Sequence, residues 1–317
     1  MSTPAFRSHC FSPTPPRGQA EWLRSSWRSH VKMSCCIALG FAFSLGFACS
    51  GSPARAADAQ LRQPIYPLAV AAFQDSDVLV ADRMLPGLWK LKAGDVPEVF
   101  LAGGSAFRQP LNAIRSVAVA ADGTTLVACS ATRDIYRVQD NGKLTGLTGG
   151  KIGIPVDIAI HPDGHCFVSD LETQQIFKVP LAGGEPQALI RLAAPRGLCV
   201  DLAGRLWAVA SSADAPLVRI ASNGTIEQIV KTRVFSFPQD VLVDAAGLAY
   251  VSDSYDSSIS RVDQTGAVTV WVKGEPLIAP VGMGWLEKEV VVADPRAGEV
   301  FLIDTTGQAR AFSNKKR

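Results

Sequence analysis

The sequence is poor in the residue patterns that several common chemistries require. Only four of its 317 residues are histidine, and the three cysteines beyond residue 56 show no Cys-x-x-Cys spacing, which excludes the usual cysteine-rich zinc sites there. The sequence has neither a glycine-rich phosphate loop nor a dinucleotide-binding fingerprint. No apolar run reaches the ~20 residues of a membrane-spanning helix. We therefore expect neither a nucleotide-dependent enzyme nor a transmembrane segment in the mature chain.

The excess of basic charge is confined to the start of the chain. The formal net charge is +2, from 31 basic and 29 acidic residues. Residues 1–56 hold six of the basic and one of the acidic groups, so 25 basic residues face 28 acidic ones in the remainder. No basic stripe is left to neutralise phosphates, and we expect no nucleic-acid partner.

Residues 1–56 have the pattern of an export signal with a long basic region in front. Basic residues precede an apolar segment over Cys35–Cys49, and Ala54-Arg55-Ala56 fits the small-x-small cleavage pattern. We expect cleavage after residue 56 and a periplasmic or extracellular protein. Two alternatives concern this region: Met33 as the true start, and Cys49 as a site of lipid attachment.

The remainder of the chain is a repeat array. Two short apolar strands joined by a tight turn recur about six times, with no helical segment after Gln60. Repeats of roughly 40 residues with four strands each are typical of propellers. The sequence therefore predicts an all-β protein, a six-bladed β-propeller of four-stranded antiparallel blades over residues 57–317. Turn glycines mark four copies at intervals of 41, 40 and 43 residues: Gly123, Gly164, Gly204 and Gly247.

Within a repeat, the second strand is apolar almost throughout, which indicates a strand covered on both faces. In the third copy we expect strands at Ile158–Ile160, Cys166–Ser169, Gln175–Val179 and Pro186–Ile190. Gln60–Ile65 is a candidate outer strand for the last blade. An aspartate ends the second strand in four copies, where we expect it to accept backbone hydrogen bonds: Asp82, Asp170, Asp253 and Asp294.

The loops of a propeller divide between two faces. Short turns join the first to the second strand and the third to the fourth, on what we call the short-turn face. Longer and more varied connections gather on the other, the long-loop face, where a rigid scaffold best presents binding residues. We call the first residue of each innermost strand its strand-start residue. These residues lie beside the long loops: Leu68, Arg115, Val156, Arg196, Gln239 and Val281.

Five residues around this centre are the candidate ligand-binding residues: Arg115, Arg196 and Gln239, with Asp157 and Asp240 one position further along their strands. Paired guanidinium groups favour carboxylates and sugar acids. The alternative for the two arginines is a salt bridge to one of these aspartates inside the scaffold, because buried charges need partners.

Two local motifs resemble known propeller families. Pro195–Trp207, with its Pro-Arg-Gly start and Gly-Arg-Leu-Trp end, resembles a segment of the SMP-30/gluconolactonase family. Third strands such as Ile135–Val138 and Ile176–Val179 are similar to NHL repeats. The likeness extends over residues 64–313. It implies a six-bladed propeller and, in the lactonases, a divalent cation held by Glu, Asn and Asp side chains near the strand starts.

The chain departs from that metal site. The strand-start positions hold Leu68, Val156 and Arg196, so no ligand carries over, and an arginine opposes a hard cation. Asp157 and Asp240 lie one residue after the strand-start residues, so their side chains are expected to point to the opposite side of the strand from the ligand positions. A register error of one residue would make them candidate ligands again. We predict no metal and no cofactor, with one calcium or zinc ion as the alternative.

The remaining polar clusters give weaker signals. His161 and His165 fall on a turn of the short-turn face, where we expect solvated histidines. Ser254-Tyr255-Asp256 is a candidate contact patch, but histidines so placed cannot complete a Ser-His-Asp triad. We interpret Cys129, Cys166 and Cys199 as small buried residues, with a single disulfide as the alternative.

These observations predict an exported, monomeric, non-catalytic propeller. It would bind a small anionic or hydroxyl-rich molecule, or an acidic loop of a protein partner, on its long-loop face. The alternative is a divalent-metal-dependent hydrolase of lactones or related esters. A purely structural interaction module, with its channel filled by apolar side chains, is a third possibility.

Overall fold

A computed structural model describes residues 64–74, 76–84 and 86–312. Every regular element in these residues is a β-strand, so none of them forms a helix that could span a membrane. The predicted export signal and the predicted boundary at residue 57 lie outside the described residues.

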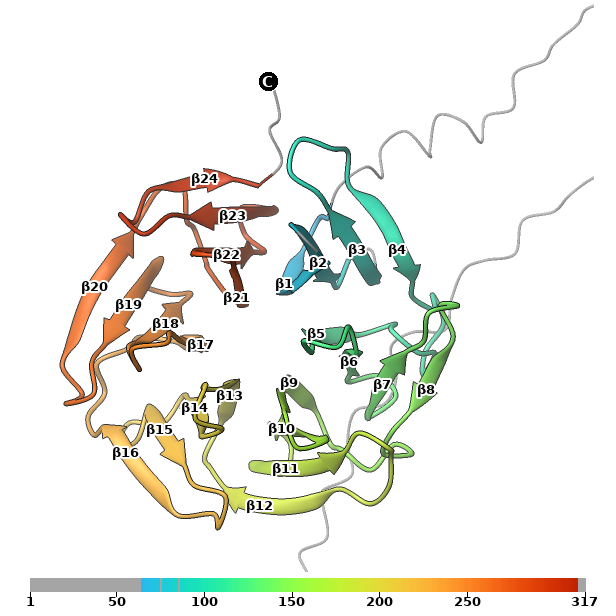
Figure 1. Cartoon of the computed structure of the whole chain (residues 1–317), viewed down its shortest axis with the longest axis horizontal. Coiled ribbons are helices and arrows are strands. Elements are labelled where there is room, and N and C mark those ends of the chain that lie inside the picture. Colours follow the sequence, from blue (N-terminus) through green and yellow to red (C-terminus); the bar gives the residue numbers. More distant parts are fainter. Residues whose placement is uncertain (1–63, 75, 85, 313–317) are drawn as a thin grey trace, which may run out of the picture. The chain divides into compact units, whose positions relative to one another are not determined.

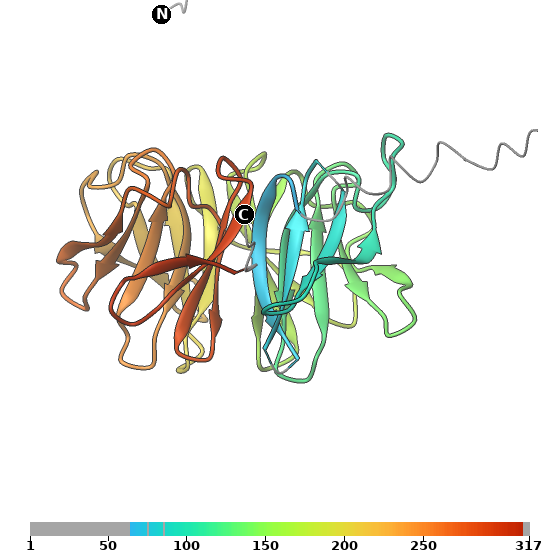
Figure 2. The ribbon, with the colours of Figure 1, turned by 90° about the horizontal axis from the view of Figure 1, so that it is seen from above.

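The strands form six four-stranded antiparallel sheets arranged in a ring, which confirms the predicted six-bladed propeller (Figure 1). Each blade contains four consecutive strands, and its first strand is the innermost (Figure 1). Figure 2 shows the same ring from its side, with loops on both faces. The first three blades are β1 (Pro67–Phe73), β2 (Asp77–Asp82), β3 (Gly87–Leu91) and β4 (Glu98–Ala102); β5 (Ile114–Val119), β6 (Thr125–Cys129), β7 (Asp134–Val138) and β8 (Leu144–Gly146); and β9 (Pro155–His161), β10 (His165–Asp170), β11 (Gln175–Pro180) and β12 (Gln187–Arg191). The last three are β13 (Pro195–Val200), β14 (Leu206–Ala210), β15 (Leu217–Ile220) and β16 (Ile226–Val230); β17 (Pro238–Val243), β18 (Ala249–Asp253), β19 (Ser258–Val262) and β20 (Val268–Lys273); and β21 (Met283–Leu286), β22 (Glu289–Asp294), β23 (Glu299–Ile303) and β24 (Ala309–Ala311).

The apolar core consists of six clusters, each between two adjacent blades. Strand β2 illustrates why the second strands are apolar almost throughout and do not alternate between apolar and polar residues. Val78 and Val80 pack against the last blade, whereas Leu79 and Ala81 pack against the second. Successive side chains of a strand point to opposite faces, so a strand buried on both faces needs an unbroken apolar run. The expectation that second strands are covered on both sides is confirmed.

The ring closes through side-chain packing. Residues of β1–β3 and β21–β23 share one apolar cluster, and β24 is the outermost strand of the last blade. Ile65, the described end of the candidate outer strand Gln60–Ile65, lies against the first blade, because its N–H donates to Asp82 Oδ2 at 2.6 Å. Every described sheet is therefore made from one continuous segment of the chain.

The repeated aspartates accept backbone hydrogen bonds, as predicted. Asp170 Oδ1 accepts from the N–H of Glu172 in the following loop. The same carboxylate also accepts from the N–H groups of Gly153 and Ile154, both at 2.8 Å, in the segment that leads into β9. Each of these aspartates thus joins two loops of its blade on the long-loop face. Asp82, Asp253 and Asp294 form the same contacts in the first, fifth and sixth blades.

Innermost strands begin with an irregularity that recurs from blade to blade. In the first five blades the pairing with the second strand shifts by one residue, at Leu68, Arg115, Val156, Arg196–Gly197 and Gln239. A β-bulge leaves one residue unpaired and redirects side chains near it. Five of the six strand-start residues predicted to surround the central channel therefore occupy bulges, whereas Val281 lies before β21.

Candidate functional site

Three bulged residues carry polar side chains, and in each of their blades a serine directly follows the second strand. Gln239 Nε2 donates to Ser254 Oγ at 3.0 Å, and Arg115 Nε lies 3.5 Å from Ser130 Oγ. Ser211 occupies the matching position in the fourth blade, after β14, and its buried hydroxyl has no hydrogen-bond partner among the described residues. The long-loop face thus carries one donor–hydroxyl pair in each of the second and fifth blades and an unpaired hydroxyl in the fourth.

Arg196 is held by an aromatic ring. Its guanidinium lies 4.5 Å from the centroid of Phe237, and Phe237 stacks on Tyr255 with centroids 4.7 Å apart and an interplanar angle of 22°. A guanidinium over an aromatic face is attracted by the ring quadrupole, which replaces part of its lost hydration. Arg196 Nε is nevertheless buried without a hydrogen-bond partner. The aromatic ring therefore holds the side chain in position, but the Nε–H group lacks a hydrogen-bond acceptor.

The two central arginines form no ion pair with any described residue. Burial lowers the pKa of both, and the charges of Arg83 and Arg196 lower the pKa of Arg115 further. Each shift means that the surroundings disfavour the positive charge. The alternative in which Arg115 and Arg196 pair with Asp157 or Asp240 is wrong, because both carboxylates bind elsewhere.

Asp157 and Asp240 connect neighbouring inner strands. Asp157 accepts from Ser116 Oγ at 2.6 Å and from the Leu198 N–H at 2.7 Å. Asp240 accepts from the Met283 N–H of the next blade at 2.7 Å. These are contacts between β5, β9 and β13, and between β17 and β21. The two carboxylates therefore link innermost strands of neighbouring blades.

The surroundings of these carboxylates oppose their negative charge. Burial raises the pKa of Asp157. Burial also raises the pKa of Asp240 well above its usual range, and the charge of Asp157 adds to that shift. The two carboxylates therefore interact across the intervening strand β13. Gly197 allows strand β13 to lie close to β17, since a Cβ atom at this position would lie 2.4 Å from Asp240 Cα.

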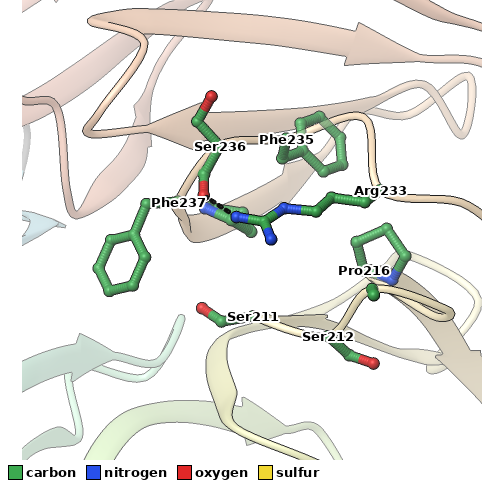
Figure 3. Close-up of a pocket in the computed structure, with 9 residues that line it drawn as sticks. Ser211, Ser212, Pro216, Arg233, Phe235, Ser236 and Phe237 are labelled. Carbon is green, nitrogen blue, oxygen red and sulfur yellow. Dashed lines mark hydrogen bonds between the residues drawn. The ribbon is translucent and has the colours of Figure 1, made fainter.

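A pocket of about 190 Å³ opens on the long-loop face between the fourth and fifth blades. The loop after β14 contributes Ser211 and Ser212, and the segment before β17 contributes Arg233, Phe235 and Phe237 (Figure 3). Arg233 is exposed and donates to the Ser236 carbonyl at 3.4 Å. Phe237 lines this pocket and also packs against the Arg196 guanidinium, so Arg196 adjoins the pocket through that ring.

Sequence reasoning missed the contribution of the segment before β17. The predicted site included the loops that follow second strands and the strand-start residues, but not the segments that connect one blade to the next. The available signal was the pair of aromatic residues Phe235 and Phe237 in a connection otherwise rich in polar residues. Tyr255, from the candidate contact patch, is 76% exposed beside Phe237, whereas Asp256 pairs with Lys273 at 2.6 Å.

The channel residues do not fit the cation that the lactonase resemblance implies. Asp157 and Asp240 each accept backbone N–H groups, and no third His, Cys, Asp or Glu completes a ligand group with them in the described part of the chain. Arg115 and Arg196, at the starts of innermost strands, bring positive charge to the same face. The one such group of three in the described residues lies on the short-turn face, at His161, Asp163 and His165.

Solved structures of several different proteins share this fold. A virginiamycin B lyase from Staphylococcus aureus is 14% identical, with a TM-score of 0.60 over 80% of this chain and 86% of the lyase. A gluconolactonase from Xanthomonas campestris is 14% identical, with a TM-score of 0.62 over 74% of this chain and 85% of the enzyme. A chain of a nidogen–laminin complex is 17% identical, with a TM-score of 0.62 over 79% of this chain and 94% of its own length.

No protein-family model and no curated protein sequence matches the chain. The structures that resemble it include two enzymes of different reaction type and a component of a protein complex. Fold likeness at such identities therefore does not choose among reactions or partners. What the comparisons show is the propeller fold.

Proposed function

We propose that the protein is an exported, non-catalytic propeller that binds a small anionic or hydroxyl-rich ligand, or an acidic loop of a partner, at the long-loop face. The observation that carries this proposal is the pair of central arginines, which have no carboxylate partner among the described residues. A partly buried cation without a counter-ion is costly. A ligand carboxylate placed between Arg115 and Arg196 would supply the missing negative charge.

The neighbouring groups support a ligand that carries hydroxyl groups as well as charge. The unpartnered Ser211 hydroxyl and the Gln239 amide provide further hydrogen-bonding groups beside the arginines. Guanidinium groups bind carboxylates in a bidentate manner. The pocket that adjoins Arg196 through Phe237 has a volume of about 190 Å³, below the ~300–1,000 Å³ of drug-sized sites, which suits the remainder of a ligand of sugar-acid size or a single acidic side chain.

Calorimetric titration of the full chain tests this proposal. Sodium gluconate is the anionic probe, sorbitol is its uncharged counterpart, and a hexaglutamate peptide represents an acidic loop. We expect gluconate or the peptide to bind and sorbitol to bind far more weakly. Arg196→Ala and Arg115→Ala should each lower the affinity by about 10–100-fold, the effect of losing a charged hydrogen bond.

Arg310→Ala is the matched control, because Arg310 is an exposed arginine that pairs with Glu289 on the last blade. Its removal should leave the affinity unchanged. Equal affinities for gluconate and sorbitol, or affinities that neither central arginine variant alters, would contradict the proposal.

A divalent-metal-dependent hydrolase of lactones or related esters is the second candidate. The likeness to a gluconolactonase and the presence of Asp157 and Asp240 on inner strands favour it. Its test is the hydrolysis of glucono-1,5-lactone with added calcium or zinc, before and after EDTA. Hydrolysis that EDTA abolishes, and that Asp157→Asn also abolishes, would support the enzyme and contradict a purely binding function.

Export rests on the sequence pattern of residues 1–56. Amino-terminal sequencing of the protein recovered outside the cytoplasm tests it, with Ala57 as the expected first residue. A chain that is retained inside the cell and begins at Met1 or Met33 would contradict export.

A further inference from the structure

A second polar cluster lies on the short-turn face of the third blade, on the opposite face of the ring from the site above. Strand β9 ends at His161 and β10 begins at His165, and these two residues lie directly opposite each other in the antiparallel pair. Asp163 occupies the turn between them. One ligand atom from each of the three side chains lies within 4.8 Å of the other two.

The two imidazole rings are held in place and are not solvated as the sequence predicted. They stack with centroids 4.6 Å apart and an interplanar angle of 14°, and the Phe167 ring packs edge-on at 4.8 Å from His165. The side chains of His161 and His165 are only 18% and 8% exposed. Asp163 is 58% exposed, so the cluster is open to solvent on one side.

The partners of His161 fix the orientation of its ring. Its Nε2 lies 3.1 Å from the Gly204 carbonyl, which can only accept, so Nε2 carries a proton. Its Nδ1 faces Asp163 Oδ1, and His165 Nδ1 faces the same oxygen. Two ring nitrogens and one carboxylate oxygen therefore lie close together.

We propose that His161 Nδ1, His165 Nδ1 and Asp163 Oδ1 form a site for a divalent transition-metal ion of the zinc class. A single cation would be bound by both ring nitrogens and by the carboxylate oxygen that faces them. Two imidazoles and one carboxylate form a donor set that suits zinc better than calcium. The exposed side of Asp163 leaves room for a water ligand. The His161 Nε2–H bond to Gly204 orients that ring, as outer-shell partners of metal-binding histidines commonly do.

Lys178 on β11 is the charged neighbour that opposes a cation here. Its positive charge acts on both Asp163 and His165. The site is therefore weaker than the same three ligands would be alone, and removal of this charge should strengthen metal binding. A merely structural role for the cluster does not predict that effect.

Cobalt titration of the metal-free full chain, followed by zinc competition, tests the site. We expect a visible absorption band from one Co²⁺ bound through nitrogen and oxygen ligands, and its loss on addition of zinc but not of calcium. His161→Asn should remove the band. Asp163→Asn, a change at an exposed turn residue, should weaken binding by at least about tenfold. Lys178→Gln should tighten binding by about threefold.

The uncleaved chain also carries His9 and His30, the other two histidines, so His9→Asn and His30→Asn in that uncleaved chain are the controls. Both should bind cobalt as the unmodified protein does, and far-ultraviolet circular dichroism should show that every variant is folded. The proposal is overturned if the protein takes up neither metal, if Asp163→Asn and His161→Asn bind as tightly as the unmodified chain, or if binding is lost only in the His9 or His30 variant.

Discussion

The Asp157 carboxylate accepts a hydrogen bond from the Leu198 backbone N–H at 2.7 Å, and these residues are 41 positions apart, one repeat along the chain. Ser116 donates to the same carboxylate from 41 residues in the other direction, and Asp240 repeats the contact with Met283 at a separation of 43. Side chains at equivalent positions therefore link consecutive inner strands around the channel. The stability of the ring should depend on these links.

Asp157→Ala is expected to destabilise the propeller by about 1–3 kcal/mol. The change leaves the buried Ser116 hydroxyl and the Leu198 N–H without their acceptor, and an unsatisfied buried polar group carries a cost of that size. Urea denaturation followed by fluorescence measures the effect. Asp122→Ala, at an exposed turn, is the control and should change the free energy of unfolding far less. Equal effects of the two variants would show that the links between inner strands are not important for stability.

Asp240→Asn should change how stability varies with pH. The folded state raises the pKa of Asp240, so between pH 3.8 and the folded-state pKa the unfolded chain loses this proton while the folded chain keeps it. The contribution of Asp240 is therefore fully present below pH 3.8 and is lost as the pH rises. We expect the free energy of unfolding of the unmodified protein, minus that of Asp240→Asn, to fall as pH rises above about 4. Thermal melts between pH 3.5 and 8 measure it, and a difference that stays constant or rises would contradict the assigned shift.

Gly197→Ala is expected to be strongly destabilising, by more than about 2 kcal/mol. The added Cβ would lie 2.4 Å from Asp240 Cα, and backbone at that distance cannot move aside without separating the inner strands β13 and β17. Gly284→Ala is the matched control, since its nearest contact would be 3.2 Å, to the Val70 carbonyl oxygen. Differential scanning calorimetry should give a clearly larger fall in melting temperature for Gly197→Ala than for the control.

The thiols of Cys166 and Cys199 should be unreactive in the folded protein. Burial raises the pKa of each to about 12, and only the thiolate is nucleophilic. We expect iodoacetamide at pH 8 to modify both residues in urea and neither in native buffer, as read by peptide mass spectrometry. Rapid native labelling of either residue, at the rate of a free peptide thiol, would show that its blade opens readily. Cys129, Cys166 and Cys199 are free in the structure, so the disulfide alternative is not formed.

The fold could be predicted from local pattern because each blade repeats a short-range signal. The apolar second strands, the turn glycines and the terminal aspartates recur at nearly constant spacing, and a four-stranded meander needs only neighbouring segments to pair. Three of the four strands expected in the third copy agree with β10, β11 and β12 to within one residue at each end, whereas Ile158–Ile160 covers only part of β9. What the pattern did not reveal about Asp170 was its second set of partners, Gly153 and Ile154, in the loop before its own blade.

The candidate site was only partly predictable. Arg115, Arg196 and Gln239 are at the strand starts as expected, but the partner of Arg196 is Phe237, which comes from the next blade. A contact between side chains 41 residues apart depends on how two blades face each other, and no local pattern encodes it. The same holds for His161, whose Nε2 lies against the Gly204 carbonyl of the neighbouring turn.

By itself, the sequence determined the number of blades, the four strands in each and the face that carries the long loops. The period of the repeat and the alternation of side chains along a strand are local properties that survive any detail of packing. Only the tertiary structure decided where the carboxylates and guanidinium groups point. One extra residue at the start of an inner strand changes the side to which the following side chains are directed, and their partners belong to neighbouring blades. Asp157 and Asp240 consequently accept N–H groups of the next inner strand, while Arg196 contacts an aromatic ring and no carboxylate.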